Sequence, residues 1–171
     1  MAIWFYGCVT LDGYLAGTDH GLDWLYDTGG VEETGYAAFY EQMDVTLMGR
    51  RTFHALEQAG TQACPYPTTE NYVFTHRALS RPGFQAVSGD VVEFAQGLGR
   101  DKNIWVVGGN TVLAPLLDVN RVDRLILQIA PVLLGRGIPL FTQGEDLKRF
   151  SLEAVRKYGP FAELEYWKKE G

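Results

Sequence analysis

Three short segments combine glycine, hydroxyl and guanidinium groups directly after apolar runs. Residues 49–52 read Gly-Arg-Arg-Thr, residues 75–77 read Thr-His-Arg, and residues 108–111 read Gly-Gly-Asn-Thr. Backbone N–H groups at a helix start and arginine side chains are the donors that bind phosphate groups in proteins. If the three segments converge, they offer the donors that a diphosphate with an additional phosphate requires. Each segment alone is equally well explained as a tight turn or as solvated surface, so the inference depends on their meeting.

The segments would meet if the strands that precede them are parallel. Residues 104–107 are apolar without alternation, which is typical of a strand covered on both faces. Apolar residues at helical spacing follow the Gly-Gly pair from residue 112 onward. Further strands are predicted at residues 2–10, 45–48, 71–75, 84–87, 122–129, 150–155 and 162–168. Helices are predicted at residues 34–43 and 91–98, and a short helix is predicted after residue 52, through Phe53 and Leu56. Residues 22–33 are predicted to be a mobile or substrate-facing segment.

The order of the predicted elements indicates the fold class: strands alternate with helices through most of the chain, and only strands follow at its C-terminal end. This order predicts an α/β protein of three layers, with a mixed, mostly parallel sheet and an antiparallel C-terminal hairpin. The chain of 171 residues is most simply a single domain spanning residues 1–171.

Composition excludes several classes of partner. The net charge is −6 and the positive residues form no long run, so neither nucleic acid nor an anionic membrane is expected as a partner. Cys8 and Cys64 have no metal-type spacing, and no metal site is expected. Neither a leader-like segment nor an apolar run long enough to cross a bilayer is visible. A cytoplasmic protein that acts on a small-molecule substrate is therefore expected.

Four motifs, taken in order, resemble the dihydrofolate-reductase-like fold. They are TLDG at residues 10–13, LMGRRT at 47–52, VVGG at 106–109 and APVLLGRGIPLF at 130–141. The last motif is typical of the riboflavin-type branch rather than of true dihydrofolate reductases. The chain thus looks most like the reductase domain at the C-terminal end of the bifunctional riboflavin-biosynthesis deaminase-reductase and its stand-alone relatives. The resemblance covers nearly the whole chain, although the sequence contains no zinc signature of the deaminase.

The resemblance implies an NADPH-dependent reductase of the 5-amino-6-(5-phosphoribosylamino)uracil reductase type, acting on a small pyrimidine- or pteridine-like substrate. It places residues 49–52 on the cofactor phosphates, residues 75–77 on the adenosine 2′-phosphate, and residues 108–111 along the diphosphate and nicotinamide ribose. It also implies that the Gly108–Gly109 peptide is cis and contacts the nucleotide. The expected cofactor-binding residues are Gly49, Arg50, Arg51, Thr52, Thr75, His76, Arg77, Gly108, Gly109, Asn110 and Thr111.

Two carboxylates are candidates for a catalytic proton donor. Asp12 follows the first strand, where it is equally well explained as a turn residue. Glu33 has the same offset from Gly49 as the substrate-binding carboxylate of dihydrofolate reductases. Between residues 11 and 33 the only basic side chain is His20, fewer than a phosphosugar substrate would favour. The family resemblance also implies a homodimer, with the apolar segment 131–141 as its interface. A true dihydrofolate reductase and a non-catalytic nucleotide-binding module are the alternatives.

Overall fold

The computed structural model describes residues 1–60 and 62–169. The strands are β1 (Ala2–Thr10), β2 (Tyr14–Ala16), β3 (Val45–Gly49), β4 (Glu70–Phe74), β5 (Gln85–Val87), β6 (Asn103–Gly108), β7 (Arg124–Ala130), β8 (Ile138–Pro139), β9 (Phe150–Tyr158) and β10 (Phe161–Lys168). The helices are α1 (Asp23–Tyr26), α2 (Tyr36–Tyr40), α3 (Arg50–Gln58), α4 (Val91–Gly97) and α5 (Asn110–Asp118), with a 3-10 turn η1 (Val31–Glu33).

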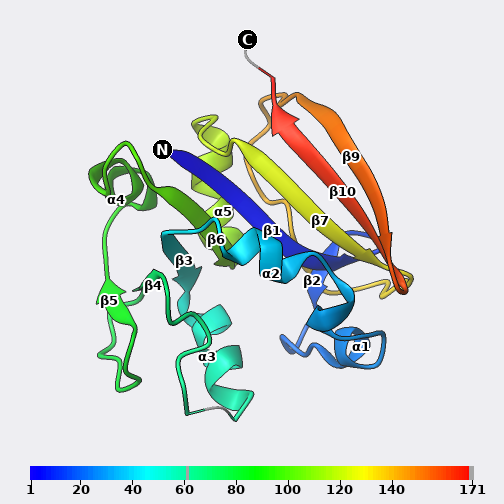
Figure 1. Cartoon of the computed structure of the whole chain (residues 1–171), viewed down its shortest axis with the longest axis horizontal. Coiled ribbons are helices and arrows are strands. Elements are labelled where there is room, and N and C mark those ends of the chain that lie inside the picture. Colours follow the sequence, from blue (N-terminus) through cyan, green and yellow to red (C-terminus); the bar gives the residue numbers. More distant parts are fainter. Residues whose placement is uncertain (61, 170–171) are drawn as a thin grey trace.

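An eight-stranded sheet forms the centre of the molecule, in the order β5-β4-β3-β6-β1-β7-β10-β9. The strands from β5 to β7 in this order are parallel, whereas β10 runs antiparallel to both β7 and β9. The last two strands form the hairpin along one edge of the sheet in Figure 1. The predicted mixed, mostly parallel sheet with an antiparallel C-terminal hairpin is confirmed.

Helices cover both faces of the central strands, because successive residues of those strands point to opposite faces. In β1, Ile3 and Phe5 pack into a cluster that also contains residues of α4 and α5. Trp4 and Tyr6 point the other way, into a cluster that contains residues of α2 and α3. Figure 1 shows α2 crossing in front of β1. A strand that is buried on both faces explains the unbroken apolar runs seen in the sequence.

Two parts of the fold differ from the sequence-based expectations. Helix α2 is shorter than the predicted helix at residues 34–43, because the chain turns toward the sheet and the Asp44 N–H bonds to the Asn103 C=O. Strands β2 and β8 were not predicted, yet they pair with each other as a separate two-stranded antiparallel sheet. Strands this short carry no recognisable alternation. None of the described helices is long and apolar enough to cross a membrane.

Candidate functional site

The carboxyl ends of parallel strands β3, β6 and β1 border one cavity of about 660 Å³. This volume lies in the range of small-molecule sites, and the edge where parallel strands end is the usual ligand position in α/β sheets. Two of the three predicted segments converge here, as their placement after parallel strands required. The predicted residues that line the cavity are Gly49, Arg50, Arg51, Thr52, Gly108, Gly109, Asn110 and Thr111.

The glycines at the ends of β3 and β6 lie close together, and the space for a Cβ is ordinary at Gly49 and Gly109 but tight at Gly108. A Cβ added at Gly109 would lie 3.7 Å from the Gly49 nitrogen, and one added at Gly108 would lie 3.2 Å from the Thr52 hydroxyl oxygen. Gly109 has φ 86° and ψ 120°, a conformation that side chains with a Cβ rarely adopt. The Gly108–Gly109 peptide is trans, so the expected cis bond is wrong. The positive φ of Gly109 redirects the chain into α5 instead.

Of the three helices that begin at the cavity, α3 and α5 have glycine at their N-caps. Gly49 precedes α3 and Gly109 precedes α5, and neither helix start has a side-chain cap. In contrast, the Asp90 carboxylate caps α4 by accepting hydrogen bonds from the N–H groups of Val92 and Glu93. The first N–H groups of a helix have no acceptor within the helix. At α3 and at Asn110 and Thr111 of α5, these donors have no side-chain cap and can meet an anion in the cavity, whereas the Val112 N–H already bonds to the Gly109 C=O.

The guanidinium groups beside this site are not equivalent. Arg50 Nη2 lies 3.7 Å from the Glu57 carboxylate, which neutralises part of its charge. Arg51 is exposed and forms no ion pair with any residue in the described ranges. Of the two arginines in α3, Arg51 is therefore the one that a ligand phosphate could pair with without competing against a carboxylate of the protein.

The third predicted segment lies next to the cavity without lining it. Phe74, at the end of β4, is a lining residue, whereas Thr75, His76 and Arg77 follow it in a turn in which the Arg77 N–H donates to the Thr75 hydroxyl. His76 and Arg77 are exposed. The lining also includes Gly89 and Val91 at the start of α4, which no sequence motif had indicated.

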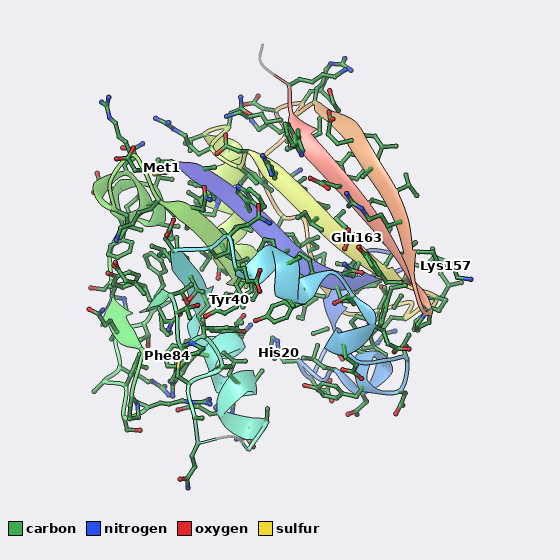
Figure 2. All side chains as sticks on the ribbon, viewed as in Figure 1. Met1, His20, Tyr40, Phe84, Lys157 and Glu163 are labelled. Atoms are coloured by element: carbon green, nitrogen blue, oxygen red, sulfur yellow. The ribbon has the colours of Figure 1, made fainter. Side chains whose placement is uncertain are left out.

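The segment around α1 forms the opposite wall of the cavity. Leu22 and Leu25 of the predicted mobile or substrate-facing segment 22–33 line it. His20 also lines it, with a positive φ of 65°. In Figure 2 the labelled His20 lies between α3 and the part of the chain that carries α1. A second hollow of about 580 Å³ between these elements shares His20 and Arg51 with the first.

Asp12 is held in place by the loop that follows β7. Its carboxylate accepts hydrogen bonds from the Thr10 hydroxyl at 2.6 Å and from the N–H groups of Leu134 and Gly135 at 3.1 and 2.8 Å. The Thr10 hydrogen bond, with smaller contributions from these N–H groups, lowers the pKa of Asp12 from 3.8 to about 2. Asp12 is therefore an anion at neutral pH and lies outside the residues that line the cavity. This geometry matches the alternative of a turn residue better than that of a proton donor.

Glu33 also lies away from the cavity wall. Its carboxylate accepts a hydrogen bond from the Gly30 N–H at 3.1 Å, and a Cβ added at Gly159 would lie 3.0 Å from Glu33 Oε1. Glu33 therefore packs beside the turn of the β9–β10 hairpin and is not among the lining residues.

Several lining residues had no signal in the sequence. Gly7 and Cys8 come from the interior of β1, Leu15 and Ala16 from β2 and its end, and Ile138 from β8. Only Ile138 lies in a segment, residues 130–141, that had been singled out. Burial raises the pKa of the Cys8 thiol to about 12, so Cys8 contributes to the site as a small neutral group.

A three-layer fold whose glycine-lined cleft lies at the carboxyl ends of β3 and β6 defines a protein of the dihydrofolate-reductase-like class. Solved structures agree on the fold. A structure from Shewanella sp. PV-4 matches with a TM-score of 0.84 at 24% identity, covering 99% of this chain and 100% of that one. The Thermotoga maritima diaminohydroxyphosphoribosylaminopyrimidine deaminase/5-amino-6-(5-phosphoribosylamino)uracil reductase matches with a TM-score of 0.72 at 16% identity, covering 98% of this chain and 56% of that one.

The chain belongs to the RibD C-terminal domain family, whose model matches residues 3–162. The uncharacterized protein YwjB of Bacillus subtilis (strain 168) is 30% identical over 172 residues, covering 94% of each chain. The riboflavin biosynthesis protein RibD of Escherichia coli (strain K12) is 37% identical over 79 residues, which is 42% of this chain and 22% of that protein. The resemblance to the riboflavin-biosynthesis reductase family is thereby confirmed.

Proposed function

We propose that this protein is an NADPH-dependent reductase that acts on a small pyrimidine- or pteridine-like substrate. The observation that supports this most strongly is the pair of glycine-capped helix starts at one cavity. Both α3 and α5 present uncapped N–H groups there, whereas α4 is capped by its own Asp90. Two such anion sites beside each other match a ligand with two linked phosphates.

Each segment has a distinct part in the proposed complex. Residues 49–52 and 108–111 hold the diphosphate and the nicotinamide ribose, and Arg51 adds a charge-assisted contact. Residues 75–77, of which His76 and Arg77 are exposed beside the end of β4, hold the adenosine 2′-phosphate. The cofactor supplies the hydride when bound, so the protein has to orient the reactants and exclude water. Leu22 and Leu25 on the opposite wall provide the apolar cover.

The test is calorimetric titration with NADPH, with NADH as the comparison. We expect saturable NADPH binding at micromolar to low millimolar concentrations. Replacing Arg77 with alanine should weaken NADPH and leave NADH unchanged, because only NADPH carries the 2′-phosphate. Replacing Arg51 with alanine should weaken both nucleotides. Absence of saturable NADPH binding at millimolar concentration would refute the proposal.

A non-catalytic nucleotide-binding module is the second candidate. It is favoured by one observation: neither Asp12 nor Glu33, the two carboxylates predicted as proton donors, lines the cavity. NADPH oxidation measured over a panel of pyrimidines, pterins and quinones separates the two candidates. Nucleotide binding without turnover of any of them would favour the module. Turnover of dihydrofolate would instead identify a dihydrofolate reductase, which membership of the RibD C-terminal domain family disfavours.

The assembly that we propose is a cytoplasmic homodimer that uses the loop after β7. In that loop Leu133 and Phe141 are 73% and 43% exposed, so both side chains are available for burial against a second copy of the chain. Sedimentation velocity should give twice the 19.1 kDa chain mass. Leu133→Asp should shift the protein to the monomer. A wild-type monomer at tens of micromolar would argue against the dimer.

A further inference from the structure

The cavity at the ends of β3 and β6 contains few side chains that can exchange a proton. Of the described residues that line it, only Cys8, His20, Arg50 and Arg51 are titratable. Burial raises the pKa of the Cys8 thiol to about 12, which makes this thiol a poor acid at neutral pH. Arginine side chains keep their protons in proteins. His20 is therefore the lining residue suited to acid–base chemistry, and histidine is the residue type that enzymes use most often for this purpose.

The His20 imidazole is free to meet a ligand. It is exposed on the cavity wall, and no group among the described residues forms a hydrogen bond or an ion pair with either ring nitrogen. His54 differs in both respects. Its Nδ1 lies 3.5 Å from the Glu57 carboxylate and its Nε2 lies 3.4 Å from the Gln58 amide nitrogen. It lines the second hollow and is not among the residues that line the first.

The backbone at His20 does not explain why a histidine occupies this position. In the part of the chain that the structure describes, the non-glycine residues with a positive φ are His20 and Asn120. Asn120 follows the end of α5, where this conformation is common. His20 lies in a turn in which its N–H donates to the Gly17 C=O and the Gly17 N–H donates to the Gly21 C=O, both at 2.9 Å. Neither bond uses the imidazole, and glycine adopts such a backbone more easily.

We propose that His20 is the catalytic proton donor of the reduction. The inference rests on the proposed function, because it takes the substrate to lie between His20 and a nicotinamide held along residues 108–111. The bound cofactor supplies a hydride to the carbon of a polarised C=N or C=O bond of the substrate and becomes NADP⁺. The electron pair of that bond moves to the nitrogen or oxygen, which takes a proton from the His20 imidazolium. The neutral imidazole then regains a proton from water.

The apolar side chains beside His20 favour a donor that belongs to the protein. Leu15, Leu22, Leu25 and Ile138 line the same cavity. A substrate ring bound against these side chains displaces water from its surface. The proton that completes the reduction then has to come from a side chain that reaches into the cavity, and His20 is the lining residue able to supply it.

His20→Gly tests this role while keeping the turn, because glycine readily adopts a φ of 65°. Turnover is measured with NADPH and three compounds: 5-amino-6-(5-phosphoribosylamino)uracil, dihydrobiopterin and menadione. For the compound that the wild type reduces fastest, kcat of His20→Gly should fall about 100-fold, the usual contribution of a general acid. Its NADPH affinity should stay within about twofold of wild type. Added imidazole should raise kcat of His20→Gly about tenfold and leave the wild type unchanged, which loss of a purely structural residue would not produce.

Two further variants separate the acid from the turn and from the neighbouring histidine. Asparagine also tolerates a positive φ, and its amide cannot transfer a proton at neutral pH, so His20→Asn should lose as much kcat as His20→Gly. His20→Asn decides the question if His20→Gly does not fold. His54→Gln is the matched control, because His54 is an exposed histidine outside the lining of the first cavity. It should keep the wild-type kcat.

Chemical labelling provides a readout that does not depend on turnover. Diethyl pyrocarbonate modifies exposed imidazoles, and mass spectrometry reports the modification of each histidine separately. Saturating NADP⁺ would occupy the cavity that His20 lines, so it should slow the modification of His20 at least about fivefold. The modification of His54 should not change. Equal labelling of His20 with and without bound NADP⁺ would overturn its placement beside the reacting groups.

The outcomes separate this inference from the proposed function. A wild-type protein that does not bind NADPH refutes both. NADPH binding and turnover, with kcat of His20→Gly and His20→Asn within about threefold of wild type, refute only the role of His20 and make it a turn residue. NADPH binding without turnover of any of the three compounds also overturns the inference, because no reaction then remains for His20 to serve.

Discussion

Gly109 and Gly49 should respond very differently to replacement by alanine, although both line the cavity. Gly109 has a φ of 86°, which an alanine adopts only at a cost of about 1–3 kcal/mol. Gly49 has φ −82° and ψ 166°, ordinary extended backbone that any residue adopts. In neither case does the added Cβ clash, because its nearest neighbours lie at 3.6 Å or more. Backbone conformation, and not space, should therefore decide the difference in stability.

The magnitude follows from the strain and the size of the chain. A loss of about 2 kcal/mol in Gly109→Ala corresponds to a fall in Tm of roughly 4–8 °C for a protein of this size. Gly49→Ala should change the unfolding free energy by less than about 0.5 kcal/mol, because the lower entropy of the unfolded chain offsets a slightly poorer N-cap. Both variants place a methyl group where the proposed cofactor must approach the backbone, so both should weaken NADPH binding at least tenfold.

Thermal unfolding by circular dichroism and NADPH calorimetry, carried out on the same samples, measure the two effects separately. Gly109→Ala should be destabilised and Gly49→Ala should not, and NADPH binding should be impaired in both variants. An unchanged Tm in Gly109→Ala would refute the assignment of strain to this glycine. Normal NADPH affinity in Gly49→Ala would instead refute the close approach of the cofactor to the end of β3.

Three further predictions concern other parts of the molecule. The pKa of Asp12 is depressed to about 2 in the folded state, so the stability that its carboxylate contributes is complete above about pH 4 and is lost as the pH falls toward 2. The acid unfolding curves of the wild type and of Asp12→Asn should therefore converge between pH 4 and pH 2. Asp12→Asn should retain turnover. Arg124 lies between the rings of Trp4 and Trp167, with its guanidinium carbon 4.1 and 4.0 Å from their centroids, so Arg124→Met should lose about 1–2 kcal/mol in urea unfolding, and Arg124→Lys should not fully restore it. Burial raises the pKa of the Cys8 thiol to about 12, so Cys8 should resist alkylation by iodoacetamide at pH 8 in the folded protein, as followed by mass spectrometry. Rapid modification would contradict the raised pKa.

Local sequence patterns predicted the main elements well. The unbroken apolar runs of β1 and β6 indicated strands buried on both faces, and the structure places a helical layer on each side of them. Glycine after the apolar residues of β3 and of β6 indicated where each strand ends and where the next helix begins. In the structure Gly49 and Gly109 are the N-caps of α3 and α5. These signals are reliable because burial and backbone conformation act over a few residues, so a short window of sequence contains them.

Features that depend on distant partners could not be predicted in this way. Whether Asp12 was a proton donor or a turn residue depended on the N–H groups of Leu134 and Gly135, which are separated from it by more than a hundred residues. Strand β2 exists only because Ile138 and Pro139 pair with it. The sequence around Asp12 and the sequence of β2 contain no information about these distant residues. Only the folded position of the partner decides whether the carboxylate is a turn residue and whether the three-residue strand forms.

The sequence by itself determined the layers, the parallel centre of the sheet, and the placement of phosphate-binding residue types directly after β3 and β6. Only the tertiary structure decided that these two segments share a cavity, that Glu33 packs beside the hairpin turn, and that the Gly108–Gly109 peptide is trans. The reason is physical: propensity and hydrophobic periodicity are properties of neighbouring residues, whereas a binding site depends on the distances and hydrogen bonds between strands brought together by the fold.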